Sequence, residues 1–95
     1  MIFAKLLYSE HYNSLHEVLH DELKQRFSKV EEGIQCDSWI WIWFGDRKVA
    51  VDTFTSMTHE VKSEMAGAHV TEVIEFLKKN YSLEVYDEPE LEPHE

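Results

Sequence analysis

The first residues of the chain are mostly apolar and alternate only loosely, with Lys5 as the one charged side chain among residues 2–8. Ile2, Ala4, Leu6 and Tyr8 occupy every second position. A period of two is typical of a half-buried strand, because successive side chains of a strand point to opposite faces. The pattern therefore predicts a strand over residues 2–8.

The next segment changes to a helical period. Ser14 and Glu17 have the spacing of a capping box, in which a hydroxyl and a glutamate bond the free amides at a helix start. The apolar residues behind them fall on one stripe of a helix, namely Leu15, Val18, Leu19, Leu23 and Phe27. We expect a helix over residues 14–28.

The middle of the chain predicts a β-meander. Residues 39–44, Trp-Ile-Trp-Ile-Trp-Phe, contain only aromatic and β-branched side chains, which favour strands. Residues 45–47 supply a turn, and residues 48–54 return as the partner strand of a hairpin. Alternation of Met57, His59 and Val61 predicts a third strand within residues 55–62. Residues 30–36 have a mixed pattern that leaves room for a further short strand.

The last part of the chain predicts a second helix, a strand and a tail. After Gly67, apolar side chains recur at helical spacing, at Val70, Val73, Ile74, Leu77 and Tyr81. Residues 83–86 predict a final strand. Residues 87–95 hold two prolines and five acidic residues without a lysine or arginine, so we expect a solvated, disordered tail.

These elements predict a single α+β domain over residues 1–86. Their order is β-α-β-β-β-α-β, with one further strand near Ile34 left open. The simplest arrangement is a mostly antiparallel sheet of four to five strands with both helices packed on one face. A chain of 95 residues has room for one such core and no more.

Composition narrows the classes of partner. Hydrophobic residues make up 43% of the chain, so it can fold unaided. Nine basic residues against 19 acidic ones give a net charge of −10. This charge argues against direct binding of nucleic acid or of anionic lipid, since both need a basic footprint. It favours a basic protein partner instead.

The sequence also indicates a compartment. Cys36 is the single cysteine, so an intramolecular disulfide is excluded and a reducing environment is expected. The first residues show no basic leader followed by a long apolar run. The longest apolar run has six residues, at positions 39–44, against the roughly 20 that span a bilayer. We expect a soluble, cytoplasmic protein that does not enter a membrane.

One motif suggests metal chemistry. His16, Glu17 and His20 match H-E-x-x-H, in which two histidines one helical turn apart bind zinc and the glutamate acts as general base. However, Leu23 stands where the extended motif has glycine, and residues 25–27 hold no histidine. Glu17 is also explained by the capping box. We therefore interpret both histidines as partly exposed helix residues, with adventitious metal binding as the alternative.

Other features give no catalytic set. The three glycines are too scattered for a phosphate-binding loop. Cys36 is expected to be a small buried hydrophobe, and His59 and His69 a strand residue and a helix-start residue. We predict no enzymatic activity, no cofactor and no metal.

The tryptophan strand carries the most information about function. Trp39, Trp41 and Trp43 project from one face of this strand. Ile40, Ile42 and Phe44 project from the other. Two short helices cover only one face of a sheet. Either the tryptophans pack under the helices and loops cover the second face, or one side of the strand remains available as an interface. Tryptophan is among the residues that most often anchor interfaces.

The acidic residues are concentrated in the second half of the chain. Residues 49–95 hold eleven acids and three bases, a balance of −8. This excess serves solubility, or it forms a surface that docks on a basic protein. The candidate contact residues are Asp46, Asp52, Glu84, Asp87 and Glu88, with Trp39, Trp41 and Trp43 as aromatic anchors.

The middle of the chain resembles a known class of protein. The tryptophan-rich strand, the Gly-Asp turn, residues 49–54 and 57–63, and the helix start at His69 and Val70 are similar to small bacterial immunity proteins. Such proteins accompany contact-dependent growth inhibition and other polymorphic toxin systems. The likeness covers residues 38–80 and is one of general pattern.

The resemblance implies a function. Immunity proteins are non-enzymatic cytoplasmic antidotes that bind a cognate toxin domain, often a basic nuclease, and mask its active site. The acidic surplus independently suits a target of that kind. The alternative is a structural or adaptor protein that forms a homodimer through the aromatic sheet face.

Overall fold

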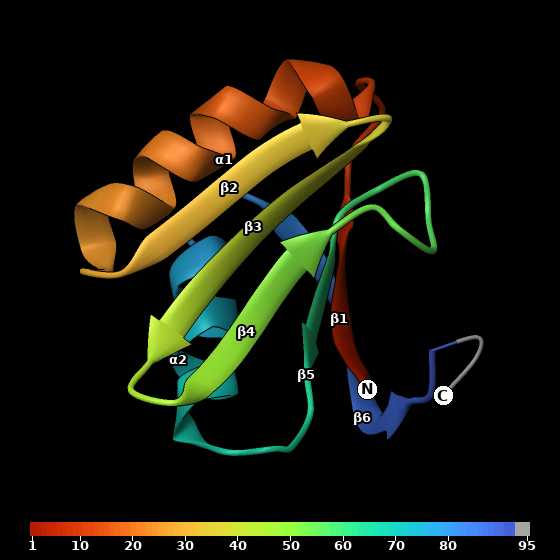
Figure 1. The fold of residues 1–95 in the computed structure, drawn as a ribbon. Helices are drawn as coiled ribbons and strands as arrows, with labels where there is room; N and C mark the ends of the chain where they lie inside the picture. Colours follow the sequence, from red (N-terminus) through yellow and green to blue (C-terminus); the bar gives the residue numbers. More distant parts are fainter. Residues whose placement is uncertain (93–95) are drawn as a thin grey trace.

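Six strands form one antiparallel sheet within residues 1–92, the part of the chain described by this computed structural model (Figure 1). The strand order is β2-β3-β4-β5-β1-β6. The elements are β1 Ile2–Leu7, α1 Tyr12–Arg26, β2 Val30–Gln35, β3 Asp37–Phe44, β4 Arg47–Asp52, β5 Glu60–Ser63, α2 Ala68–Leu77 and β6 Ser82–Glu90. The expected α+β class with an antiparallel sheet is confirmed, and the sheet is larger than expected.

Both helices pack on the same face of the sheet, behind the strands in Figure 1. On β3 the side chains of Ile40 and Ile42 are fully buried in this layer. Leu19, Leu23 and Phe27 of α1 join the same core. The buried residues of the second helix and the other strands include Val49, Val51, Val61, Val70, Val73 and Leu77. The isoleucines of β3, and not its tryptophans, therefore face the helices.

The tight turns match the local sequence. Gly45, with φ of 66°, is the first residue of the two-residue loop between β3 and β4. This is the position that a type II′ hairpin turn gives to glycine. Cys36 lies between β2 and β3 with φ of 70° and is exposed. The expectation that Cys36 is buried was wrong, because it forms the tip of a hairpin.

The first helix starts earlier than expected. It begins at Tyr12, and the His11 side chain accepts a hydrogen bond from the Asn13 amide at 3.2 Å. Ser14 and Glu17 are exposed residues inside the helix, so the capping-box prediction was wrong. The helix stripe also excludes Val18, whose side chain is 53% exposed.

The later strands differ in length from the predictions. The third strand of the meander is only Glu60–Ser63, because residues 53–59 form a loop. The mixed segment 30–36 does form a strand, β2, which explains the sixth strand. The last strand extends to Glu90 by pairing with β1, so residues 87–90 are not the start of a disordered tail. Residues 93–95 of that expected tail lie outside the described residues.

Across residues 1–92, the helices are too short or too polar to cross a bilayer.

Candidate functional site

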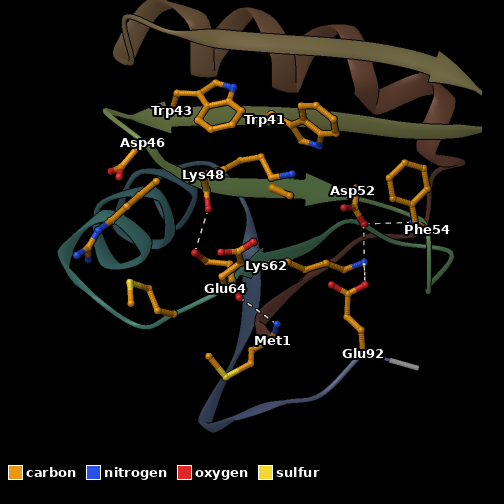
Figure 2. Close-up of a pocket in the computed structure, with 14 residues that line it drawn as sticks. Met1, Trp41, Trp43, Asp46, Lys48, Asp52, Phe54, Lys62, Glu64 and Glu92 are labelled. Carbon is orange, nitrogen blue, oxygen red and sulfur yellow. Dashed lines mark hydrogen bonds and ion pairs between the residues drawn. The ribbon is translucent and has the colours of Figure 1, made fainter. Parts of the chain in front are cut away.

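The sheet has an uncovered face on the side away from the helices. Trp39, Trp41 and Trp43 alternate along β3 with the buried isoleucines and remain partly exposed. Figure 2 shows Trp41 and Trp43 side by side on β3, with Lys48 of β4 next to them. Of the two arrangements that the sequence left open, the structure has the tryptophans on the face that neither helix covers.

The tryptophans are held in place by their neighbours. Trp39 and Trp41 have ring centroids 4.5 Å apart. The Lys48 ammonium lies 4.0 Å from the Trp41 centroid, a cation–π geometry. Trp39 packs directly over Gly33 of β2, where an added Cβ would lie 2.5 Å from the indole ring. Glycine at position 33 is therefore needed for this position of the ring.

Charged residues follow the tryptophans across the sheet. Directly opposed residues of an antiparallel pair share a face. The pairing places on one row Trp39 of β3, Asp52 of β4, Glu60 of β5, Lys5 of β1 and Glu84 of β6. The uncovered face thus changes from aromatic at β3 to acidic towards β6. Three carboxylates share this row with one lysine.

A buried lysine sits among carboxylates on this face. Lys62 Nζ lies 2.6 Å from Asp52 Oδ1 and 3.2 Å from Glu92 Oε2 (Figure 2). It also lies 3.9 Å from Glu60 Oε1. Lys62 and Asp52 are each only 3% exposed. With three acids around one base, the cluster keeps a net negative charge when all four groups are ionised.

Burial and pairing act against each other on the pKa values of this cluster. Burial raises the pKa of Asp52, although the hydrogen bond from Lys62 opposes the rise. Burial alone would lower the pKa of Lys62, but the hydrogen bond and the charge of Asp52 raise it. The lysine is therefore held as a cation beside its carboxylates.

A groove of about 820 Å³ runs over this face. Its walls include Trp41 and Trp43 on one side and Asp52 and Lys62 on the other (Figure 2). Asp46, exposed in the turn after β3, lines one end. A partner's side chains can therefore contact the indole rings and the Asp46 carboxylate within one depression, whereas Asp52 is buried against Lys62.

The remaining candidate residues lie farther away. Asp87 and Glu88 are exposed in β6, where pairing with β1 is irregular between Val85 and Glu90. β6 is the sheet edge, four strand spacings or roughly 19 Å from β3. The structure thus places Asp52 and Glu84 on the tryptophan face, Asp52 on the strand next to β3 and Glu84 at the β6 edge, where Asp87 and Glu88 also lie.

A second polar centre lies inside the protein, under α1. His16 Nε2 lies 2.6 Å from Glu32 Oε1, and His16 Nδ1 lies 2.5 Å from Ser38 Oγ. Ser38 Oγ lies 2.7 Å from His59 Nε2, and His59 Nδ1 lies 2.7 Å from the Tyr8 hydroxyl. The two outer groups, Glu32 and Tyr8, are partly exposed, whereas the three between them are buried.

This centre corrects the interpretation of the H-E-x-x-H motif. His16 is 3% exposed, not a partly exposed surface residue, and both of its ring nitrogens have hydrogen-bonding partners. His20 remains half-buried beside it, and Glu17 is exposed. Within residues 1–92, no group of three or more metal-ligating side chains is arranged to hold an ion.

Sequence reasoning missed Glu60, Lys62 and the internal chain of hydrogen bonds. Alternation around Val61 does place Glu60 and Lys62 on one face, which is a usable signal. Their meeting with Asp52 depends on strand register, and no local pattern contains it. The pairing of His16 with Ser38 and His59 is likewise tertiary.

No protein-family model, no curated protein and no solved structure matches the chain.

Proposed function

We propose that the chain is a non-enzymatic inhibitor of the immunity type, which binds a basic toxin domain in the cytoplasm and masks its active site. One observation carries the proposal. Trp39, Trp41 and Trp43 share a sheet face with the carboxylates of Asp52 and, at the far edge, Glu84, and neither helix covers this face.

The two halves of this face have different tasks. Tryptophans at the centre of an interface commonly supply most of the binding energy, since they bury large rigid surfaces. Carboxylates at the rim speed the encounter with a cationic partner and align it. The acidic rim consists of Asp46, Glu84, Asp87 and Glu88, with Asp52 behind it.

The first test is capture of the partner from the native host. Tagged protein is eluted in a salt gradient, and the bound proteins are identified by mass spectrometry. A stoichiometric basic toxin domain that leaves only at high salt supports the proposal once its activity is shown to be inhibited. A captured toxin whose activity is unaffected contradicts it.

Matched charge reversals then test the face. Glu31→Lys with Glu84→Lys changes two acids on the uncovered face, and Glu17→Lys with Glu72→Lys changes two exposed acids on the helices. Both pairs change the net charge from −10 to −6. The first pair should weaken binding and flatten its salt dependence in titration calorimetry. Equal losses for both pairs would refute this placement of the interface.

The uncovered tryptophans also support a second candidate, a homodimer through this face. Sedimentation at micromolar concentration separates the two. A monomer is expected for the inhibitor, whereas a dimer that Trp41→Ala dissociates would replace the proposal.

A further inference from the structure

The hydrogen bonds between Glu32 and Tyr8 have a direction that follows from counting hydrogens. A neutral imidazole has one N–H donor and one bare nitrogen, and a carboxylate only accepts. The hydrogen bond from His16 holds the pKa of Glu32 below its usual range, so this carboxylate is ionised at neutral pH. His16 Nε2 must therefore carry the hydrogen that Glu32 accepts, and in the neutral form of His16 this leaves Nδ1 bare.

The hydrogens of the remaining hydrogen bonds, from Ser38 to Tyr8, can then be placed in only one way. Ser38 donates its hydroxyl hydrogen to His16 Nδ1, so its oxygen accepts from His59 Nε2–H. His59 Nδ1 is then bare and accepts from the Tyr8 hydroxyl. The Tyr8 oxygen in turn accepts from the backbone amide of His59 at 3.0 Å. Every hydrogen bond between the five side chains therefore donates in the direction from Tyr8 towards Glu32.

We propose that these five side chains form a one-proton relay, in which a proton taken up at Tyr8 appears as an imidazolium at His16 and reverses the hydrogen bonds between them. The proton from solvent binds the Tyr8 oxygen, whose own hydrogen passes to His59 Nδ1. The hydrogen on His59 Nε2 passes to Ser38, and the Ser38 hydrogen passes to His16 Nδ1. One proton enters, each hydrogen moves by one place, and the new charge lies beside Glu32.

The reversed arrangement satisfies the same contacts. His16 now donates from both nitrogens, to Ser38 and to Glu32. Ser38 donates to His59 Nε2, and His59 Nδ1–H donates to Tyr8. The Tyr8 hydroxyl hydrogen turns outward, because Tyr8 is partly exposed. Protonation of His16 therefore turns the Tyr8 hydroxyl hydrogen from His59 towards the surface.

The relay holds one added proton and not two. With both imidazoles charged, Ser38 would face an N–H donor on each side and its own hydrogen would lack an acceptor, which is costly in a buried site. Burial, together with the nearby His16, lowers the pKa of His59 to about 4. The titratable or charged groups around the relay are His20 and Lys24 on α1, Glu32 on β2, and Glu10 near Tyr8.

Histidine tautomers measured by long-range ¹H–¹⁵N NMR test the relay directly. At pH 8 we expect the Nε2–H tautomer in both His16 and His59. As His16 becomes charged on acidification, His59 should stay neutral and change to its Nδ1–H tautomer with the same midpoint. A His59 tautomer that does not change, or a His59 that is charged together with His16, would overturn the proposal.

Two exposed glutamates on β2 provide a matched pair of variants. Glu32→Gln removes the counter-charge of the relay, whereas Glu31→Gln removes an equal charge on the tryptophan face. Glu32→Gln should move the protonation of His16 and the His59 tautomer change together to lower pH, because the carboxylate that favours the imidazolium is lost. Glu31→Gln should move both by much less. A shift at His16 alone, or equal shifts in both variants, would refute the coupling.

Ser38→Ala breaks the chain at its centre. Without the hydroxyl, His59 should keep one tautomer over the pH range in which the wild-type ring changes. If this variant still shows the tautomer change, the hydroxyl is not the link. The two glutamate variants keep the test decisive if Ser38→Ala fails to fold, because they alter only partly exposed side chains.

Discussion

Stability should fall on acidification because of one buried histidine. His59 is fully buried and faces Tyr8, Ser38 and His16, none of which offers it a negative charge. Burial and the nearby His16 lower its pKa from 6.5 to about 4. The unfolded chain therefore binds more protons than the folded one between these two values. The free energy of unfolding must then decrease as the pH falls through that window.

The size of the effect follows from the pKa difference. A difference of about 2.5 in pKa corresponds to about 3 kcal/mol, since one unit is worth about 1.4 kcal/mol. This contribution is fully present above pH 6.5 and lost below pH 4. For a domain of this size, that is a large share of a typical stability of about 5–15 kcal/mol.

The variant His59→Gln isolates this contribution. Glutamine does not titrate, so the variant retains every other pH-dependent group of the protein. At pH 7 we expect it to be less stable than the wild type by about 1–3 kcal/mol, because it replaces the imidazole hydrogen bonds imperfectly. By pH 4 the wild type should be no more stable than His59→Gln, or less stable.

Urea denaturation followed by tryptophan fluorescence at pH 4 to 8 measures both proteins. The difference in unfolding free energy between wild type and His59→Gln should change by about 3 kcal/mol across this range. Parallel pH profiles for the two proteins would refute the reasoning, since they would mean that His59 titrates alike in the folded and unfolded states.

Three further variants test the packing. Asp52→Ala leaves Lys62 buried without its closest partner and should lower the free energy of unfolding, measured by urea denaturation, by about 3–5 kcal/mol. A loss below about 1 kcal/mol would mean that water replaces the carboxylate. Gly33→Ala should displace the Trp39 ring, change the near-ultraviolet circular dichroism and lower the free energy of unfolding by about 1–3 kcal/mol. An unchanged spectrum would contradict the close packing of Trp39 on Gly33. Leu23→Ala should cost about 2–5 kcal/mol, unless α1 closes the cavity by shifting.

Local sequence patterns located most of the secondary structure. The Trp-Ile-Trp-Ile-Trp-Phe segment, the turn at Gly45 and the return strand were all predicted, since strand period and turn chemistry are properties of neighbouring residues. The helix starting after Gly67 was predicted for the same reason. Composition and periodicity were also sufficient for the α+β class.

Elements whose existence depends on a partner were predicted poorly. β2 has a weak pattern and is a strand because all six of its residues pair with β3. The end of β6 carries acids and a proline, yet it pairs with β1 as far as Glu90. The capping box failed because the chain already turns into the helix at His11. For β2 and β6, pairing with another strand outweighed the local preference, whereas at the helix start one local cap replaced another.

The sequence by itself determined that β3 has its tryptophans on one face and its isoleucines on the other, because the pleated backbone of a strand points successive side chains to opposite sides. Only the tertiary structure decided which face the helices cover. Ile40 and Ile42 fill the core against α1 and α2, so the tryptophans are left on the other side. The charge of −10 was likewise evident from composition, but its meeting with the tryptophans through Asp52, Glu60 and Glu84 required the strand register. Register and helix packing are set by long-range burial, and no short segment of the chain encodes them.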